Sequence, residues 1–332
     1  MSFRSNRRAT RLPPADPVLH LRVLVPAELS AAVLALLGDY PGVAHISLVA
    51  GAGIEPRGDV IELEVTREAG DELIEALNEL GVDRTGAISV TPVALSLSTG
   101  SARAQVETPG NSGDSVIWQQ VESHSAEDSS LTGTFLAFLI VATMLAAIGI
   151  VEDSPITIVG AMVVGPEFGP LAALSVGLVR RRPRLARQGG IALLIAFPLA
   201  MLVTAIGAFL ALRAGLFTQA KLDRNAQVEF IYEPGLFSLV VALLAGAAGM
   251  LSTTSQKSAA LVGVFISVTT VPAAGYVAVA AVLGEWRQVG GSALQLLINL
   301  IGIVVAGIIT LGIVQWIDGH RADRRGSGRQ RR

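Results

Sequence analysis

Glu167 is an ionisable residue in the middle of a long apolar run, residues 156–179. It lies about a dozen residues into that run, or roughly 18 Å along a helix at 1.5 Å per residue. That depth is near the middle of a bilayer, where a carboxyl group is costly and is usually functional. Its chemistry suits the binding of a proton or a cation. The alternative is a protonated Glu167 that holds a neighbouring helix by a hydrogen bond.

A proline before Glu167 and another after it predict a break in the helix. Pro166 has no N–H, so the carbonyl of Met162 loses its helical partner, and Pro170 does the same to the carbonyl of Pro166. Gly165 and Gly169 relieve backbone crowding at the same place. Freed backbone groups at membrane depth are tolerated only where protein or a water-filled cavity satisfies them. We therefore expect a broken helix that faces the interior of the fold.

A similar but weaker pattern occurs later in the chain, where Pro272 lies inside a predicted span and leaves the carbonyl of Val268 without its helical partner. Interrupted spans at matching positions of two inverted halves are the best sequence indication of a transporter site at the membrane midplane. The predicted substrate or ion site comprises Gly165, Pro166, Glu167, Gly169, Pro170, Ser154, Thr269, Thr270 and Pro272. The alternative is that small-residue runs such as Ala245–Gly249 only allow close helix packing.

The elements that would position this site are membrane-spanning helices. Of the 332 residues, 51% are hydrophobic and 16% are charged, whereas soluble domains have about a quarter of their residues charged. A span needs roughly 20 mostly apolar residues. Six runs predict spans in a polytopic α-helical domain over residues 131–317, with two inverted halves of three spans: Leu131–Val151, Ile156–Val179, Ile191–Leu212, Leu236–Leu251, Ala259–Leu283 and Ala293–Ile317.

The distribution of Lys and Arg predicts the orientation, because cytosolic loops are enriched in these residues. The second-to-third loop, the fourth-to-fifth loop and the tail together carry twelve of them, and the opposite face of a six-span arrangement carries four. Both termini are therefore expected in the cytosol, with the protein in the plasma membrane. The basic tail, residues 318–332, is expected to be disordered and to contact anionic lipids.

Residues 18–96 predict a separate cytosolic domain. Their patterns run strand, helix, strand, strand, helix, strand, which is typical of a ferredoxin-like α+β fold with a regulatory or packing role. The preceding residues 1–17 are expected to be a disordered basic segment, because no apolar core follows their positive charges as in a signal peptide. Residues 97–130 predict a linker that is flexible up to residue 113. It would end in a short amphipathic helix whose Trp118 anchors at the membrane interface.

Several function classes are disfavoured. There is no cysteine, so disulfides, thiolate chemistry and Cys-based metal sites are excluded. No GxxxxGK[ST] loop occurs, which argues against an ATP-driven pump, and the acidic leading domain argues against nucleic-acid binding. No histidine lies in a predicted span. We expect no cofactor, no metal and no enzymatic activity; the expected partners are the lipid bilayer, a small solute or ion, and further copies of the chain.

Two segments resemble a known family. Gly149, Ser154 and the run from Gly160 through Gly165-Pro166 to Gly169-Pro170 resemble the signature of the domain-of-unknown-function 389 family of bacterial and archaeal membrane proteins. The stretch Ala259–Gly275, with Gly263 and Pro272, is similar to that family's second motif. The resemblance implies a polytopic membrane protein with an attached soluble domain, and no settled activity. The residues themselves favour a channel or secondary transporter; the alternative is a non-transporting scaffold or sensor whose bundle anchors and oligomerises the soluble domain.

Overall fold

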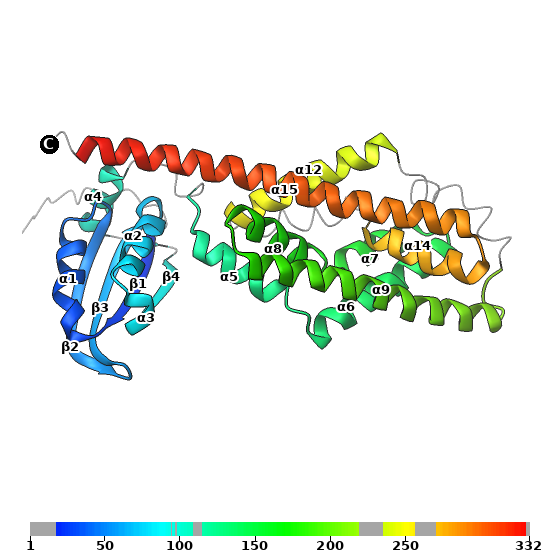
Figure 1. The fold of residues 1–332 in the computed structure, drawn as a ribbon, viewed down its shortest axis with the longest axis horizontal. Coiled ribbons are helices and arrows are strands. Elements are labelled where there is room, and N and C mark those ends of the chain that lie inside the picture. The colour runs from blue at the N-terminus through cyan, green and yellow to red at the C-terminus, as the bar shows by residue number, and fades with distance from the viewer. Residues whose placement is uncertain are drawn as a thin grey trace, which may run out of the picture. The chain divides into compact units, whose positions relative to one another are not determined.

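The structure is a computed structural model that describes residues 18–93, 95–96, 98–108, 115–218, 235–255 and 270–329, with side chains as far as residue 319. The chain divides into two compact units, Met1–Gln119 and Gln120–Arg332. An antiparallel sheet with its helices forms the first unit, and apolar helices form the second (Figure 1).

The N-terminal unit contains the four strands and two main helices that the alternation of apolar residues predicts. They are β1 (Val18–Val25), α1 (Ala27–Gly38), β2 (Val43–Ile54), β3 (Arg57–Thr66), α2 (Arg67–Glu79), the short α3 (Val82–Thr85) and β4 (Ala87–Val93). The strands lie in the order β2-β3-β1-β4, and each neighbouring pair is antiparallel.

The core of this unit follows from the two-residue period of the strands. In β1, Leu19, Leu21, Val23 and Val25 are fully buried, and α1 and α2 contribute further apolar side chains to the same cluster. The intervening polar residues of β1 lie on the opposite face, where Arg22 pairs in register with Glu62 of β3. One face of the sheet is therefore dry and the other is polar.

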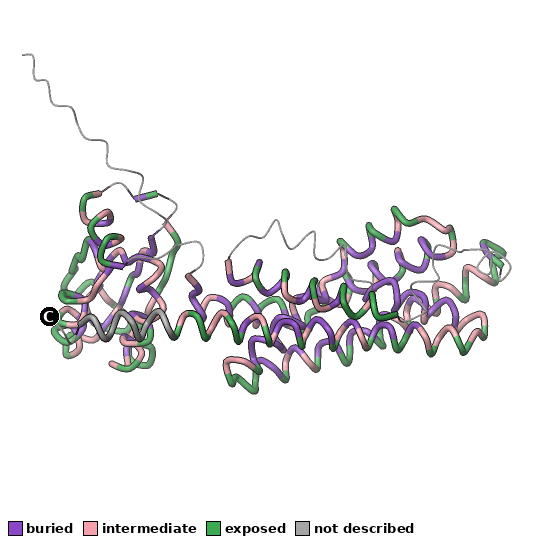
Figure 2. The backbone as a smooth tube through the Cα atoms, turned by 90° about the horizontal axis from the view of Figure 1, so that it is seen from above, coloured by how far each residue is buried: buried purple, intermediate pink, exposed green. Residues whose placement is uncertain are grey.

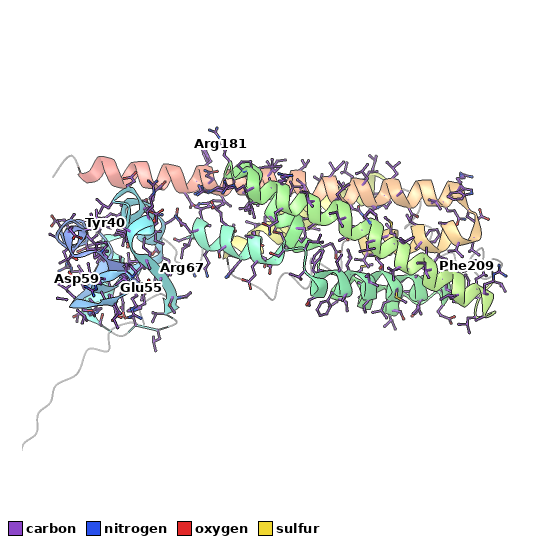
Figure 3. The ribbon with its side chains drawn as sticks, turned by 60° about the horizontal axis from the view of Figure 1, so that its bottom comes forward. Tyr40, Glu55, Asp59, Arg67, Arg181 and Phe209 are labelled. Atoms are coloured by element: carbon purple, nitrogen blue, oxygen red, sulfur yellow. The ribbon has the colours of Figure 1, made fainter. Side chains whose placement is uncertain are left out.

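A carboxylate fixes the turn region of the β2–β3 hairpin. Asp59, labelled in Figure 3, accepts hydrogen bonds from the Ser30 hydroxyl at 2.6 Å and from the Gly51 N–H at 2.8 Å. These two hydrogen bonds hold the pKa of Asp59 below its ordinary value, because both stabilise the ionised form; the bond from Ser30 has the larger effect and the bond from Gly51 the smaller. The bonds link α1 to the hairpin.

The segment predicted as a flexible linker contains a helix, so that prediction is wrong over α4 (Thr99–Glu107). Ser98 caps α4 by accepting the Ser101 N–H, and the hydroxyls of Ser96 and Ser101 donate to Glu64 on the polar face of β3. These serines are satisfied by a strand that is distant in the sequence. The local composition of small polar residues could not reveal this arrangement.

The membrane-anchor prediction for Trp118 is also wrong. Trp118 is only 3% exposed, its backbone N–H donates to Asp71 of α2, and the preceding Ile117 belongs to the core of the N-terminal unit. The helix α5 (Trp118–Asp128) begins at this tryptophan. The apolar residues that suggested an interfacial helix are thus used in protein packing.

The second unit is helical and apolar. Over the residues of this unit that the structure describes, the helices after α5 are α6 (Gly133–Val151), α7 (Pro155–Val164), α8 (Phe168–Val179), α9 (Pro183–Arg213), α12 (Leu236–Ser255), α14 (Thr270–Leu283) and α15 (Trp286–Arg329). Within the described ranges, α6, α9, α12 and α15 up to Gly319 are each long and apolar enough to cross a membrane. The bent pair α7–α8 makes five if it counts as one span. Only the α14 part of the predicted span Ala259–Leu283 lies within the described residues.

The surface of this unit carries large apolar side chains. On α9, Leu194, Leu202 and Phe209 are 75%, 58% and 46% exposed, and Phe209 is labelled in Figure 3. Buried and exposed residues alternate along the helices, so each has an inner and an outer face (Figure 2). Such an exposed apolar surface is unusual for a soluble protein and indicates a membrane protein.

The last helix, α15, continues to Arg329, so the prediction that the tail is disordered from residue 318 is wrong over most of its length.

Glycines set the closest helix crossings. A Cβ at Gly246 of α12 would lie 2.5 Å from the carbonyl oxygen of Ile303 in α15, and one at Gly275 of α14 would lie 3.0 Å from the carbonyl oxygen of Thr143 in α6. Side chains larger than hydrogen would separate these backbones. Gly246 belongs to the run Ala245–Gly249, so the small residues there do allow close packing.

Candidate functional site

The predicted break around Pro166 is confirmed. Helix α7 ends at Val164, α8 begins at Phe168, and the two axes differ by 49°. The Gly165 N–H still bonds to the carbonyl of Ala161, and Pro166, which has no N–H, cannot continue the ladder. The bend therefore lies where the covalent structure of proline requires it, and it brings Glu167 to the start of α8.

Glu167 lies inside the bundle and contacts a second element. Its side chain is 6% exposed, and the hydroxyl of Thr270 in α14 donates to its Oε1 at 2.6 Å. Thr270 is itself fully buried. Among the residues that the structure describes, the other carboxyl oxygen, Oε2, has no hydrogen-bond partner. The site is thus a buried carboxyl group with one oxygen hydrogen-bonded to Thr270 and the other buried without a partner among the described residues.

Gly165 leaves the space that the carboxyl group occupies. A Cβ at this position would overlap Oε2 of Glu167 and would lie 2.7 Å from Cγ2 of Val271. Any larger residue would therefore push the carboxyl group away or separate α14 from the break. The glycine of the predicted site has a steric role next to the acid.

The other predicted residues divide into those near the carboxyl group and those away from it. Gly169 and Pro170 form the first turn of α8, and Pro272 is buried in the first turn of α14, two residues after Thr270. Ser154 caps the far end of α7 by accepting the Thr157 N–H. The ten residues of α7, about 15 Å of helix, separate Ser154 from the break, so the structure places it away from the carboxyl group. Thr269 lies outside the described residues.

Sequence reasoning missed a polar face on α15. Ser292, Gln295 and Asn299 are 0%, 0% and 2% exposed, and their spacing puts them on one side of the helix. The Gln295 amide donates to Oδ1 of Asn299 at 3.4 Å. In the described part of the chain, Oγ of Ser292 and Oε1 of Gln295 have no partner. Three polar residues at helical spacing near the start of an apolar run were the available signal.

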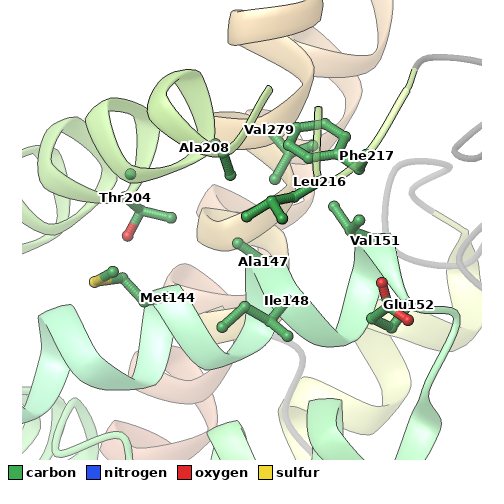
Figure 4. A pocket seen from close by; sticks show the side chains of 12 residues that line it. Met144, Ala147, Ile148, Val151, Glu152, Thr204, Ala208, Leu216, Phe217 and Val279 are labelled. Atoms are coloured by element: carbon green, nitrogen blue, oxygen red, sulfur yellow. The ribbon is translucent and has the colours of Figure 1, made fainter. Parts of the chain in front are cut away.

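A separate pocket lies elsewhere in this unit. It has a volume of about 470 Å³ and is lined mainly by apolar side chains of α6 and α9 together with Leu216, Phe217 and Val279. Figure 4 shows Thr204 and Glu152 as polar side chains at its wall. It includes none of the predicted site residues, so the candidate site does not depend on it. Across the described residues, no group of three or more His, Asp or Glu side chains is arranged to hold a metal ion.

Comparison with known proteins gives a family for the segment that contains this geometry. Residues 162–305 match the family model described as "Domain of unknown function (DUF389)". This segment is similar to the DUF389 family. The matched segment includes the break, Glu167, Thr270 and the polar face of α15, and the family resemblance expected from the Gly165–Pro170 motif is confirmed.

One relative extends the similarity beyond that domain. The chain is 24% identical over 260 residues to the uncharacterized protein MJ0678 of Methanocaldococcus jannaschii, and the aligned region covers 78% of each chain. No solved structure matches the chain. Function must therefore be argued from the geometry of the site itself.

Proposed function

We propose that the protein is an integral membrane channel or secondary transporter for a small solute or ion, with Glu167 as the ionisable group of its central site. The observation that carries the proposal is a buried carboxyl group at the break between α7 and α8, contacted by Thr270 from α14. Discontinuous helices in transporters use such breaks to bring helix ends and polar groups to a midplane site.

The incomplete hydrogen bonding of Glu167 supports binding over simple helix attachment. A buried polar atom without a partner costs about 1–3 kcal/mol, so a residue retained only to join helices would be expected to satisfy both oxygens. Within the described structure Oε2 has no partner. A carboxyl oxygen without a partner can take up a proton or a cation, and Glu167 is the one ionisable residue among the buried polar side chains of the described spans.

The surrounding architecture completes the proposal. Six spans, with both termini on the cytosolic side of the plasma membrane, agree with the bias of twelve basic residues against four. The N-terminal unit acts as a cytosolic regulatory domain; its element order and its sheet order β2-β3-β1-β4 support a ferredoxin-like fold. The protein works as a homo-oligomer, without nucleic acid, cofactor or covalent chemistry.

Flux through proteoliposomes tests the central claim. The purified protein is reconstituted, and proton and monovalent-cation fluxes are compared for wild type, Glu167→Gln and the control Glu127→Gln, which changes an exposed residue of α5. We expect Glu167→Gln to abolish the flux or its pH dependence, and Glu127→Gln to behave as wild type. Equal flux and equal pH dependence in all three proteins would make Glu167 a structural residue.

The alternative function is a non-transporting scaffold or sensor. The close crossings at Gly246 and Gly275 support it, because tight helix packing suits a rigid anchor. A folded oligomer that conducts no ion or small metabolite in the same liposomes would support the scaffold and contradict transport.

A further inference from the structure

The pocket of the helical unit, called here the α6–α9 pocket, is the strongest feature that the candidate site leaves unexplained. Its volume is about 470 Å³, within the range of about 300–1,000 Å³ that is usual for small-molecule sites. Protein interiors are packed like organic crystals, and voids larger than a water molecule are few. Empty space of this size is destabilising, so we expect the pocket to have an occupant.

Two helices line the α6–α9 pocket with the same spacing of residues. Helix α6 contributes Met144, Ala147, Ile148 and Val151, and α9 contributes Thr204, Gly207, Ala208 and Ala211. Both sets follow the spacing i, i+3, i+4, i+7, which places each set on one face of its helix. Each set extends over seven residues, or roughly 10 Å of helix. The pocket thus runs lengthwise between two helices that can each cross a membrane.

Gly207 leaves space in this pocket that close helix packing does not require. A Cβ at Gly207 would meet only Cε of Met144, at 3.4 Å, which is ordinary contact. A Cβ at Gly246, in contrast, would lie 2.5 Å from a backbone oxygen of the neighbouring helix. Glycine is unfavourable inside a helix relative to alanine, so what Gly207 provides here is room for another molecule.

The deep end of the pocket has no polar group left to bind water. The hydroxyl of Thr204 donates to Oγ1 of Thr143 at 3.0 Å, and that hydroxyl donates to the carbonyl of Leu139 at 2.9 Å. The other polar side chain of the lining, Glu152, lies at the opposite end (Figure 4). Cavities with apolar walls stay dry and bind apolar ligands. The occupant is therefore expected to be a hydrocarbon group.

The pocket opens on the side of the molecule that faces lipid. Of its lining residues, Ile148 is 54% and Leu216 is 71% exposed, whereas Phe217 and Val279 are buried and form its inner wall. Exposed apolar side chains on a membrane-spanning unit lie against the hydrocarbon of the bilayer. Glu152 is exposed and follows the last residue of α6. It marks the level of the headgroups, because a charged side chain in the hydrocarbon is costly.

We propose that the α6–α9 pocket binds an acyl chain of a bilayer phospholipid. The chain enters sideways between α6 and α9 and extends to the depth of Thr204, while its headgroup stays at the level of Glu152. It contacts Val279 of α14, the helix whose Thr270 donates to Glu167. The proposal is independent of transport, because no residue of the candidate site lines the pocket.

Lipid retention by a variant with a filled pocket tests this site. Gly207→Leu places a side chain in the pocket. The matched control is Gly312→Leu, which adds the same side chain at an exposed position of α15 where a Cβ meets nothing within 4 Å. Each protein is washed extensively in detergent, and native mass spectrometry measures the phosphatidylethanolamine that stays bound. We expect retention in Gly207→Leu to fall at least about tenfold, and the control to match the wild type. Equal retention in all three proteins overturns the proposal.

Folding is controlled by unfolding temperature and by a second filling variant, Ala211→Leu. Added phosphatidylethanolamine should raise the unfolding temperature of the wild type and of Gly312→Leu, because a ligand that binds only the folded protein stabilises it. The same addition should leave both filled variants unchanged. An equal increase in all four proteins would show that the lipid acts elsewhere, and would contradict the proposal.

Photolabelling of the unmodified chain locates the lipid without any substitution. A phosphatidylethanolamine with a diazirine in its acyl chain is added to vesicles of phosphatidylethanolamine and phosphatidylglycerol, and the labelled residues are mapped. We expect label on Ala208 and Ala211 that resists a chase with unlabelled lipid, whereas label on the exposed Leu194 and Leu202 should be displaced. Label confined to Leu194 and Leu202 would mean that lipid contacts only the outer surface, and would refute the site.

Discussion

Gly169 offers a sharp test of how the start of α8 is held in place. A Cβ at Gly169 would lie 2.6 Å from the carbonyl oxygen of Asp128 and 2.8 Å from its Cβ. Ordinary contact begins near 3.4 Å, so Gly169→Ala must separate the end of α5 from the first turn of α8 by about 0.8 Å (3.4 − 2.6). Overpacking of this kind costs about 1–3 kcal/mol, offset in part by the 0.5–1 kcal/mol that alanine gains over glycine in a helix.

Gly160→Ala is the matched control, because Gly160 lies inside α7 and a Cβ there meets nothing within 4 Å. Gly160→Ala should be stabilised by the higher helix propensity of alanine alone, so the free energies of unfolding of the two variants should differ by about 1–3 kcal/mol. For a unit of this size that corresponds to roughly 2–12 °C in unfolding temperature, measured by following loss of helix in detergent. Indistinguishable unfolding temperatures would refute the close approach of α5 and α8.

Three further predictions address other contacts. Thr270→Val should destabilise the protein by about 1–3 kcal/mol because it removes the donor to buried Glu167. Thr270→Ser keeps the donor and loses only a buried methyl group, so it should destabilise the protein less; equal thermal stability of the two variants would contradict this. Glu122→Gln removes two ion pairs at 3.0–3.1 Å to partly exposed arginines, so we expect a loss of about 0.5–1 kcal/mol that shrinks in high salt; a salt-independent loss would argue against ion pairing. The pKa of Asp59 is lower in the folded protein than in the unfolded chain, where it is about 4. Its hydrogen bonds therefore stabilise the N-terminal unit fully above about pH 4, and this stabilisation is lost as the pH falls through the pKa of the folded protein. Ser30→Ala should flatten that dependence in amide hydrogen exchange measured across this range, and an unchanged profile would exclude the Ser30 bond as its cause.

Local chemistry made part of this structure predictable. The break at Pro166 was predictable because a missing N–H acts within one helical turn, whatever surrounds it. The strands were predictable because Leu19 to Val25 alternate with polar residues, and burial on one face of a sheet imposes that period. In both cases the residues that decide the structure are adjacent in the sequence.

The parts that could not be predicted depend on distant partners. Nothing near Glu167 indicates that Thr270 binds it, and nothing in residues 98–107 indicates that Glu64 satisfies the serines around α4. Trp118 resembled a membrane anchor because an aromatic residue before an apolar run is ambiguous until its packing is known. The polar face of α15 was overlooked because its residues are isolated among apolar neighbours.

The contact between Glu167 and Thr270 has a consequence for biogenesis. The two residues are 103 positions apart, and a ribosome adds about 5–20 residues per second. The bent pair α7–α8 therefore exists for roughly 5–20 s before its partner helix is made. During that interval its carboxyl group has no α14 to contact and must be sheltered by the insertion machinery or remain near the interface. Completion of this site is thus a late event in synthesis, and truncation before Thr270 would leave an acid in the membrane without its donor.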